Sequence, residues 1–259
     1  MKLSFSKYEG AGNDFILVDG RKIDSEFATV PVVAHLCDRH FGIGADGFII
    51  LYPSDRADFR MKYFNSDGRE GTMCGNGGRC MAAFARRLGV IGEEGVFEAI
   101  DGLHQVSLEK NGRVTLQLND VQGIRELEDG YLLDTGSPHF VTFTDGLDDI
   151  DVFARGRVLR NEPRFREGVN INFTQLLPGG IRVRTYERGV EEETLSCGTG
   201  ITAAAMALVY RDQERAAPVS VNARGGSLTV DFVHESPGFF TQVKLAGPAT
   251  FVFDGTINI

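Results

Sequence analysis

Residues 73–80 read Met73-Cys74-Gly75-Asn76-Gly77-Gly78-Arg79-Cys80, a cysteine followed at once by a glycine-rich turn. After Gly78, apolar side chains recur at helical spacing up to Gly89, which predicts a buried helix with a glycine stop. The arrangement occurs again at Ser196-Cys197-Gly198-Thr199-Gly200, and the residues that follow are apolar nearly all round. That pattern predicts a second helix, enclosed by a sheet.

Cys74 and Cys197 are therefore each expected at or just before the N-terminus of a helix. The unpaired backbone N–H groups there, with roughly half a positive charge from the helix dipole, favour a thiolate over a thiol. Because the thiolate is the reactive form, both cysteines are candidate acid–base groups near neutral pH.

The two cysteines lie 123 positions apart in a chain of 259 residues, and this spacing suggests a duplicated unit. Two further pairs of landmarks match at offsets of 124 to 126 positions: Gly12-Asn13-Asp14-Phe15 with Gly136-Ser137-Pro138-His139-Phe140, and Gly42-Ile43-Gly44-Ala45-Asp46 with Gly168-Val169-Asn170-Ile171-Asn172. We expect two homologous domains, residues 1–119 and 120–247, with a C-terminal strand at 248–259 that returns to the first.

Short strand patterns separated by glycine-containing turns fill both halves, and Asn111-Gly112 is a hairpin signal. The strand at 58–64 leads into Asn65-Ser66-Asp67-Gly68, upstream of Cys74, and the strand at 181–186 leads into Glu187-Arg188-Gly189, upstream of Cys197. Each half is expected to be a sheet wrapped around one buried helix.

Composition limits the function. The formal charge of −9 argues against a nucleic-acid partner, and an apolar content of 42% allows a sizeable core. The absence of a signal peptide and of an apolar run near 18 residues predicts a soluble cytoplasmic protein that binds no membrane. Thiols stay reduced in that compartment, so no disulfide is expected. Cys37 and Cys80 complete the four cysteines; their spacings fit no metal site, and Cys37 is expected to be inert packing.

Seven motifs in this order resemble the diaminopimelate epimerase family across almost the whole chain. They are Gly10-Ala11-Gly12-Asn13-Asp14-Phe15, Phe64-Asn65-Ser66-Asp67-Gly68, the stretch at 73–80, Gly136-Ser137-Pro138-His139, Gly168-Val169-Asn170-Ile171-Asn172-Phe173, Tyr186-Glu187-Arg188-Gly189 and the stretch at 196–200. The resemblance implies an α/β (α+β) fold of two pseudo-symmetric domains, each a curved, mostly antiparallel sheet around a central helix. It also implies cofactor-independent conversion of LL- to meso-diaminopimelate in a cleft between the two domains of the chain. A homodimer is a further expectation.

The resemblance also implies roles for individual residues. Cys74 and Cys197 are the two bases, supported by His139 and Glu187. Substrate-binding positions are Asn13, Asn65, Gly75, Asn76, Asn170, Glu187, Arg188, Gly198 and Thr199. Some family members have glutamine where Gly47 stands and asparagine where Ser137 stands, so water, a shorter hydroxyl or another residue must replace those contacts.

The chemistry fits this interpretation independently. Inverting a carbon centre requires one group to remove a proton from one face and another to return one to the opposite face. The helix N–H groups would stabilise the carbanion. Three alternatives stay open: a proline or hydroxyproline racemase of the same fold, a pyridoxal-phosphate enzyme, and a non-catalytic anion-binding module. Of the six lysines, none lies in a glycine-rich phosphate turn. Read singly, His139 could be a turn residue and Glu187 with Arg188 a solvated pair.

Overall fold

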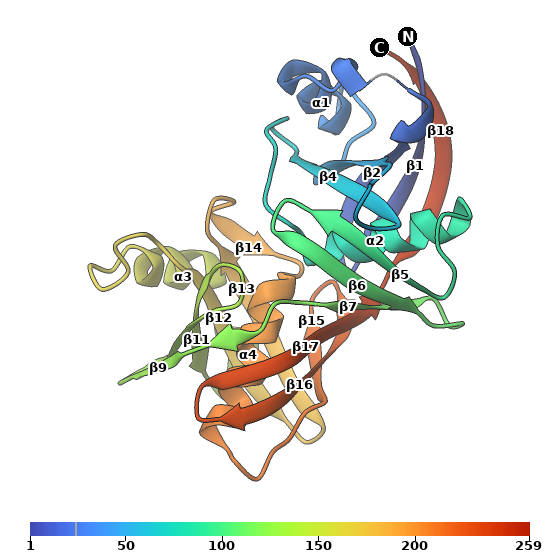
Figure 1. Cartoon of the computed structure of the whole chain (residues 1–259). Coiled ribbons are helices and arrows are strands. Elements are labelled where there is room, and N and C mark those ends of the chain that lie inside the picture. The colour runs from blue at the N-terminus through green and yellow to red at the C-terminus, as the bar shows by residue number, and fades with distance from the viewer. Residues whose placement is uncertain (24) are drawn as a thin grey trace. The chain divides into compact units, whose positions relative to one another are not determined.

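The computed structural model describes residues 1–23 and 25–259, and it divides into two compact units (Figure 1). The first unit is Met1–Leu116 with Gly247–Ile259, and the second is Gln117–Ala246. The strands of the first unit, in their spatial order, are β18 (Thr250–Asn258), β1 (Lys2–Gly10), β2 (Asn13–Asp19), β3 (Gly47–Tyr52), β4 (Phe59–Asn65), β5 (Glu94–Ala99), β6 (Gly102–Leu108) and β7 (Arg113–Gln117).

The second unit has a sheet of the same kind. Its strands, in spatial order, are β9 (Ile124–Leu127), β10 (Gly130–Asp134), β11 (Pro138–Phe143), β12 (Asn170–Leu177), β13 (Gly180–Glu187), β15 (Val219–Ala223), β16 (Gly226–Ser236), β17 (Phe239–Pro248) and β8 (Val121–Gln122). A short strand, β14 (Glu192–Thr194), pairs with the end of β13.

The strand pairings repeat between the units. Along β1-β2-β3-β4-β5-β6-β7 they run antiparallel, parallel, antiparallel, parallel, antiparallel, antiparallel. The series β10-β11-β12-β13-β15-β16-β17 gives the same order. The expectation of two pseudo-symmetric, mostly antiparallel sheets is therefore confirmed.

One long helix lies inside each sheet. In the first unit α2 (Gly75–Arg87) contacts β1, β2, β3, β4, β6 and β18, and in the second α4 (Gly198–Arg211) contacts β10, β11, β12, β13, β15 and β16. Eleven of the fourteen residues of α4 are buried, as its apolar sequence predicted.

The glycine-rich stretch after Cys74 differs from the expected turn, because it is the first turn of α2, closed by a 2.8 Å hydrogen bond from Gly78 N to Cys74 O. A Cβ on Gly77 would lie 3.0 Å from the Ile49 side chain, and one on Gly78 would lie 2.9 Å from the methyl group of Met73. Glycine is thus required here by close packing of the helix against its surroundings rather than by a turn.

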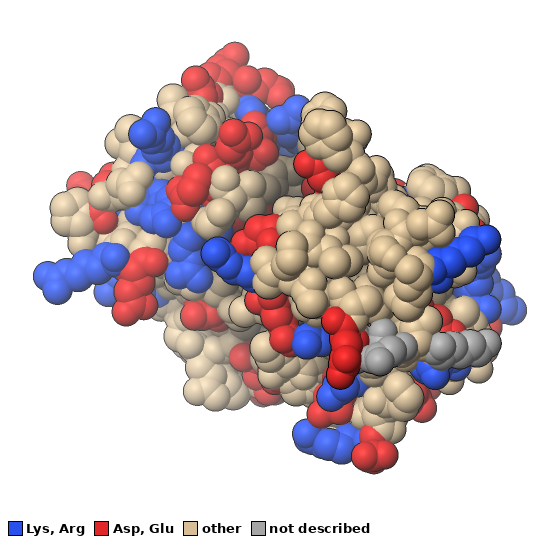
Figure 2. All heavy atoms as spheres, turned by 90° about the horizontal axis from the view of Figure 1, so that it is seen from above, with Lys and Arg blue, Asp and Glu red and all other residues tan. Residues whose placement is uncertain are grey.

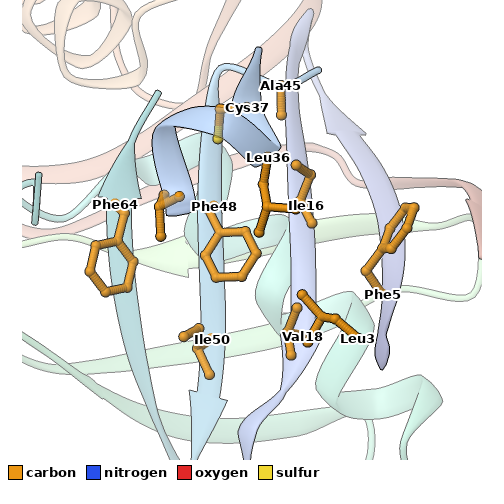
Figure 3. Packing of buried hydrophobic residues seen from close by; sticks show 11 residues of the cluster. Leu3, Phe5, Ile16, Val18, Leu36, Cys37, Ala45, Phe48, Ile50 and Phe64 are labelled. Carbon is orange, nitrogen blue, oxygen red and sulfur yellow. The ribbon is translucent and has the colours of Figure 1, made fainter. Parts of the chain in front are cut away.

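A second helix covers the other face of each sheet. In the first unit α1 (Val30–Cys37) packs on alternate side chains of β1 to β4, and Figure 3 shows this cluster. Cys37 is buried in it, and burial raises the pKa of its thiol to about 12, so the expected packing role is confirmed. In the second unit α3 (Val152–Arg160) was not predicted from the sequence; the Asp151 side chain caps it by accepting a 2.9 Å hydrogen bond from Ala154 N.

Three single-turn 3₁₀ helices complete the described structure: Gly20–Lys22, Ser25–Phe27 and Leu147–Asp149. Among the described residues, no helix combines the length and apolar character that crossing a membrane requires.

Candidate active site

Cys74 and Cys197 occupy equivalent places in the two units. Each is the residue immediately before the first residue of the central helix, with extended backbone angles. Both side chains are partly accessible, whereas Cys80, one turn into α2, is fully buried. Burial raises the pKa of the Cys80 thiol, so Cys80 is a neutral packing group. The prediction that both cysteines start a helix is confirmed.

In the first unit, two predicted substrate-binding residues contact each other. Asn76, buried in the first turn of α2, donates from Nδ2 to Oδ1 of Asn13 at 2.6 Å. Asn13 in turn donates to the Asp46 carboxylate at 3.1 Å. The network fixes Asn13 beside the N-terminus that carries Cys74, and Gly75 lies in the same helical turn.

Asp46 is itself held by charges. Arg39 bridges Asp46 and Asp14, each at 2.7 Å, and the buried Lys7 ammonium lies 2.8 Å from Asp14. The hydrogen bonds and charges of Arg39 and Lys7 outweigh the effect of burial, and they lower the pKa of Asp14 to about 2. An ionised cluster therefore anchors the loop that positions Asn13.

Asn65 ends β4 and is exposed, directly opposite Gly47 in the ladder. A Cβ on Gly47 would lie 2.5 Å from the ring of Tyr63 and 3.0 Å from its hydroxyl oxygen. A Cβ on Gly71 would lie 2.7 Å from the same ring and 3.0 Å from Nδ2 of Asn65. The space that a side chain at position 47 would need is thus taken by Tyr63.

In the second unit, a chain of hydrogen bonds leads from Cys197 into the core. The Thr199 hydroxyl lies 3.5 Å from Cys197 Sγ and 2.9 Å from Nε2 of His139. Asn172 places Nδ2 3.1 Å from the other ring nitrogen, Nδ1, and accepts a 2.9 Å hydrogen bond from the Thr185 hydroxyl. Because Nδ1 faces an amide donor, the ring proton is assigned to Nε2, which donates towards Thr199 or Ser137.

His139 is uncharged in this setting. Its side chain is fully buried, and burial, followed by the charge of Arg188, lowers its pKa from 6.5 to about 3. The ring that faces the Thr199 hydroxyl is therefore neutral rather than cationic.

Alternation along β12 explains why these polar groups meet. Ile171 and Phe173 point into the apolar cluster beneath α3, so Asn170 and Asn172 point to the opposite face, towards α4. A Cβ on Gly200 would come within 2.3 Å of Asn172 Oδ1. Gly200 thus lets α4 approach β12 closely enough for Thr199 to reach His139.

Arg188 and Asn170 are joined through the backbone. Arg188 N donates to Asn170 Oδ1 at 2.8 Å, and Asn170 Nδ2 donates to Ser137 Oγ at 3.2 Å and to Pro138 O at 3.0 Å. The Ser137 hydroxyl also lies 3.0 Å from His139 Nε2, so the shorter side chain at 137 is held within the protein.

The Arg188 guanidinium is exposed, donates to Glu167 O at 3.3 Å, and forms no ion pair with any carboxylate in residues 1–23 and 25–259. Glu187 precedes it at the end of β13. An arginine that pairs with no protein carboxylate can bind the carboxylate of a ligand by donating two parallel hydrogen bonds to it.

Sequence reasoning missed Asn172 and Arg79 as site residues. Asn172 had a signal: it lies two positions after Asn170 in a strand where polar and apolar residues alternate, so both amides share a face. Arg79 had none, because its complete burial and its contact with the Pro248 carbonyl depend on segments far away in the chain. No group of three or more His, Cys, Asp or Glu side chains that could hold a metal ion occurs in the part of the chain that the structure describes.

Comparison with known proteins identifies close relatives. The family model for diaminopimelate epimerase matches residues 5–123 and 131–252. A diaminopimelate epimerase of Flavobacterium psychrophilum is 46% identical over 253 residues, covering 97% of this chain and 98% of the relative. That of Chlorobaculum tepidum is 39% identical over 259 residues, covering 96% and 99%.

Solved structures with low sequence identity share the fold. A phenazine biosynthesis protein of the PhzF family from Bacillus anthracis matches with a TM-score of 0.80 at 15% identity and full coverage of both chains. A hydroxyproline epimerase from Agrobacterium vitis matches with a TM-score of 0.67 at 16% identity, covering 99% of this chain and 92% of that one.

Proposed function

The chain belongs to the diaminopimelate epimerase family, and on that premise we propose that it interconverts LL- and meso-diaminopimelate by a two-base, cofactor-independent reaction that uses Cys74 and Cys197. The observation that carries the proposal is the repeated placement of a partly accessible cysteine immediately before a central helix. A reaction that inverts a carbon centre needs two such groups, one for each face.

In each turnover one cysteine acts as thiolate and removes the α-proton, and the other acts as thiol and delivers a proton to the opposite face. The electron pair of the broken C–H bond is held by the α-carbon and its carboxylate until the new C–H bond forms. The roles exchange in the reverse direction. After one turnover the protonation states of the two cysteines are reversed, and exchange with solvent restores them.

The carbanion is stabilised by the N–H groups in the first turns of α2 and α4, from Gly75, Asn76, Gly198 and Thr199. These groups point out of helix N-termini, where the backbone leaves them without intrahelical partners. Removing one donor of this type in other enzymes costs about 3–4 kcal/mol of transition-state stabilisation, so several together supply a large part of the rate enhancement.

Supporting residues differ between the two cysteines. Thr199 links the neutral His139 to Cys197. Its hydroxyl can accept a hydrogen bond from His139 Nε2 and donate one to the Cys197 sulfur. Glu187 supports the reaction from the end of β13. The distal amino-acid group of the substrate is held by Asn13, Asn65, Asn170 and Arg188, with the Arg188 guanidinium on its carboxylate. Asn170 contributes largely by holding the Arg188 backbone.

We propose a homodimer in the cytoplasm as the working form. The support is β18, whose described pairing is with β1 and which exposes three consecutive apolar residues, Phe251, Val252 and Phe253, at 42%, 51% and 45%. An exposed apolar edge strand favours association with another chain. On the face shown in Figure 2, acidic and basic side chains are intermixed. Sedimentation of the wild type and of Val252→Lys tests the homodimer. A dimeric wild type and a weakened dimer in the variant are expected, whereas a monomeric wild type would contradict the proposal.

A substrate panel tests the function. Purified protein is incubated separately with LL-diaminopimelate, meso-diaminopimelate, proline, hydroxyproline and glutamate, and the stereoisomers are separated by chiral chromatography. Interconversion of the two diaminopimelates, with the other three unchanged, is expected. Faster inversion of proline or hydroxyproline would assign the chain the activity of its same-fold relatives. Binding without inversion of any compound would leave an anion-binding module.

A further inference from the structure

Arg79 is the largest fully buried side chain of the described protein, with 0% of its surface accessible. Its guanidinium turns back towards the start of α2. Nη2 donates to Asn76 Oδ1 at 2.7 Å, and Nη1 and Nε reach the carbonyl oxygens of Gly75 and Pro248, both at 3.4 Å. The two helix partners are the two residues that directly follow Cys74.

All three of these acceptors are neutral, and Arg79 forms no ion pair with a carboxylate of residues 1–23 or 25–259. Burial lowers the pKa of the Arg79 guanidinium, and the charge of Arg113 acts in the same direction. An isolated buried cation is costly, so such groups are normally matched by a negative charge.

The candidate counter-charges around Arg79 are few. Cys80 is adjacent, but burial keeps its thiol neutral. Glu9 on β1 also raises the pKa of Arg79, and Arg113 on β7 lowers it. Cys74 is partly accessible, and it lies immediately before the helical turn to which the guanidinium is hydrogen-bonded.

The second unit has no such cation. The position equivalent to Arg79, 123 residues later, is Thr202, whose hydroxyl donates to Gly198 O at 3.0 Å within the helix. The Thr199 hydroxyl lies 3.5 Å from Cys197 Sγ, and His139, which this hydroxyl contacts, is neutral. The two helices thus differ at this position, with a buried guanidinium in α2 and a hydroxyl in α4.

We propose that Arg79 is a positioning residue that holds Cys74 as the thiolate in the free enzyme, while Cys197 rests as the thiol. The proposal rests on the proposed function for its meaning, because a two-base inversion needs one cysteine in each state before substrate arrives. The difference between the two cysteines then depends on Arg79, a side chain that does not touch the reacting carbon.

Alkylation kinetics test the proposal without any substrate, so the outcome does not depend on whether diaminopimelate is turned over. The rates at which iodoacetamide modifies Cys74 and Cys197 are measured from pH 5 to 10 by peptide mass spectrometry, in the wild type, Arg79→Met and Arg79→Lys. Methionine is long and apolar enough to occupy the buried site, and lysine keeps the charge.

In the wild type, the Cys74 profile is expected to have its midpoint below that of Cys197. In Arg79→Met, the Cys74 midpoint should rise by about 1 pH unit or more, the shift that a close opposite charge produces, with Cys197 unchanged. Arg79→Lys should retain most of the difference. A wild-type Cys74 midpoint at or above that of Cys197 overturns the proposal, and that measurement needs no variant to fold. Equal shifts at both cysteines in Arg79→Met would show a merely structural role and would equally overturn it.

Discussion

Replacing Thr199 by valine tests the link between Cys197 and the buried histidine. Valine keeps the β-branched shape and the backbone N–H, and it removes only the hydroxyl that lies 3.5 Å from Cys197 Sγ and 2.9 Å from His139 Nε2. His139 keeps the Ser137 hydroxyl at 3.0 Å, so its proton is not left without an acceptor. Any loss of activity is therefore attributed to the missing hydrogen bond to the Cys197 sulfur.

The size of the effect follows from the charge on the acceptor. A hydrogen bond to a charged group contributes about 1.5–3 kcal/mol. At about 1.4 kcal/mol per factor of ten, Thr199→Val should lower kcat by roughly 10- to 150-fold. KM should change little, because the backbone N–H of residue 199 remains available to the substrate carboxylate.

The assay is steady-state epimerisation of both isomers, followed by chiral chromatography, with Thr199→Ser as the matched control. Serine retains the hydroxyl and should stay within several-fold of the wild type. If Thr199→Val keeps a kcat within twofold of the wild type, the hydroxyl does not serve Cys197 and the proposed relay is wrong.

Three further predictions concern the remaining site residues. Cys74→Ala and Cys197→Ala should each abolish epimerisation while the circular dichroism spectrum stays native, since each removes one base; substantial turnover by either variant excludes the two-base assignment. Arg188→Met should lower kcat/KM for diaminopimelate by roughly 10- to 150-fold, because the distal carboxylate loses a charged hydrogen-bond donor worth about 1.5–3 kcal/mol, and an unchanged kcat/KM would argue against this contact. Because His139 has a pKa of about 3 in the folded state against 6.5, the unfolded chain binds the extra proton, so the free energy of unfolding should fall as the pH drops from 6.5 towards 3. Urea titrations of His139→Gln over this range should show a shallower fall, and an unchanged slope would contradict it.

The sequence predicted the features that depend on local patterning. The helix starts at Cys74 and Cys197 were predicted from a cysteine, glycines and an apolar run. The repeat of one fold in the two halves was predicted from matched spacings along the chain. The Asn111-Gly112 hairpin between β6 and β7 is also present, with Gly112 at a φ of +86°. Each of these is specified by residues close together in the chain.

The features that were missed depend on distant contacts or on weak periodicity. Helix α3 exposes Phe153 and Val158, so its apolar pattern does not mark one face. The glycines of α2 and α4 resembled turn residues because the side chains that exclude a Cβ there belong to other strands, such as Asn172 at Gly200. The role of Arg79 could not be read from the helix alone, since its charge is interpretable only when the neutral acceptors around it are known.

The central claim is that one cysteine removes the proton and a different one replaces it, and inversion in D₂O tests this most directly. LL-diaminopimelate is converted by the wild type in D₂O, and both isomers are analysed by mass spectrometry at low conversion. The account predicts deuterium at the inverted carbon of the meso product and little in the recovered LL substrate, because the abstracted proton stays on one thiol while the other delivers deuterium. Meso product that retains the substrate's own hydrogen would contradict it, since that result requires a single base to carry the proton across.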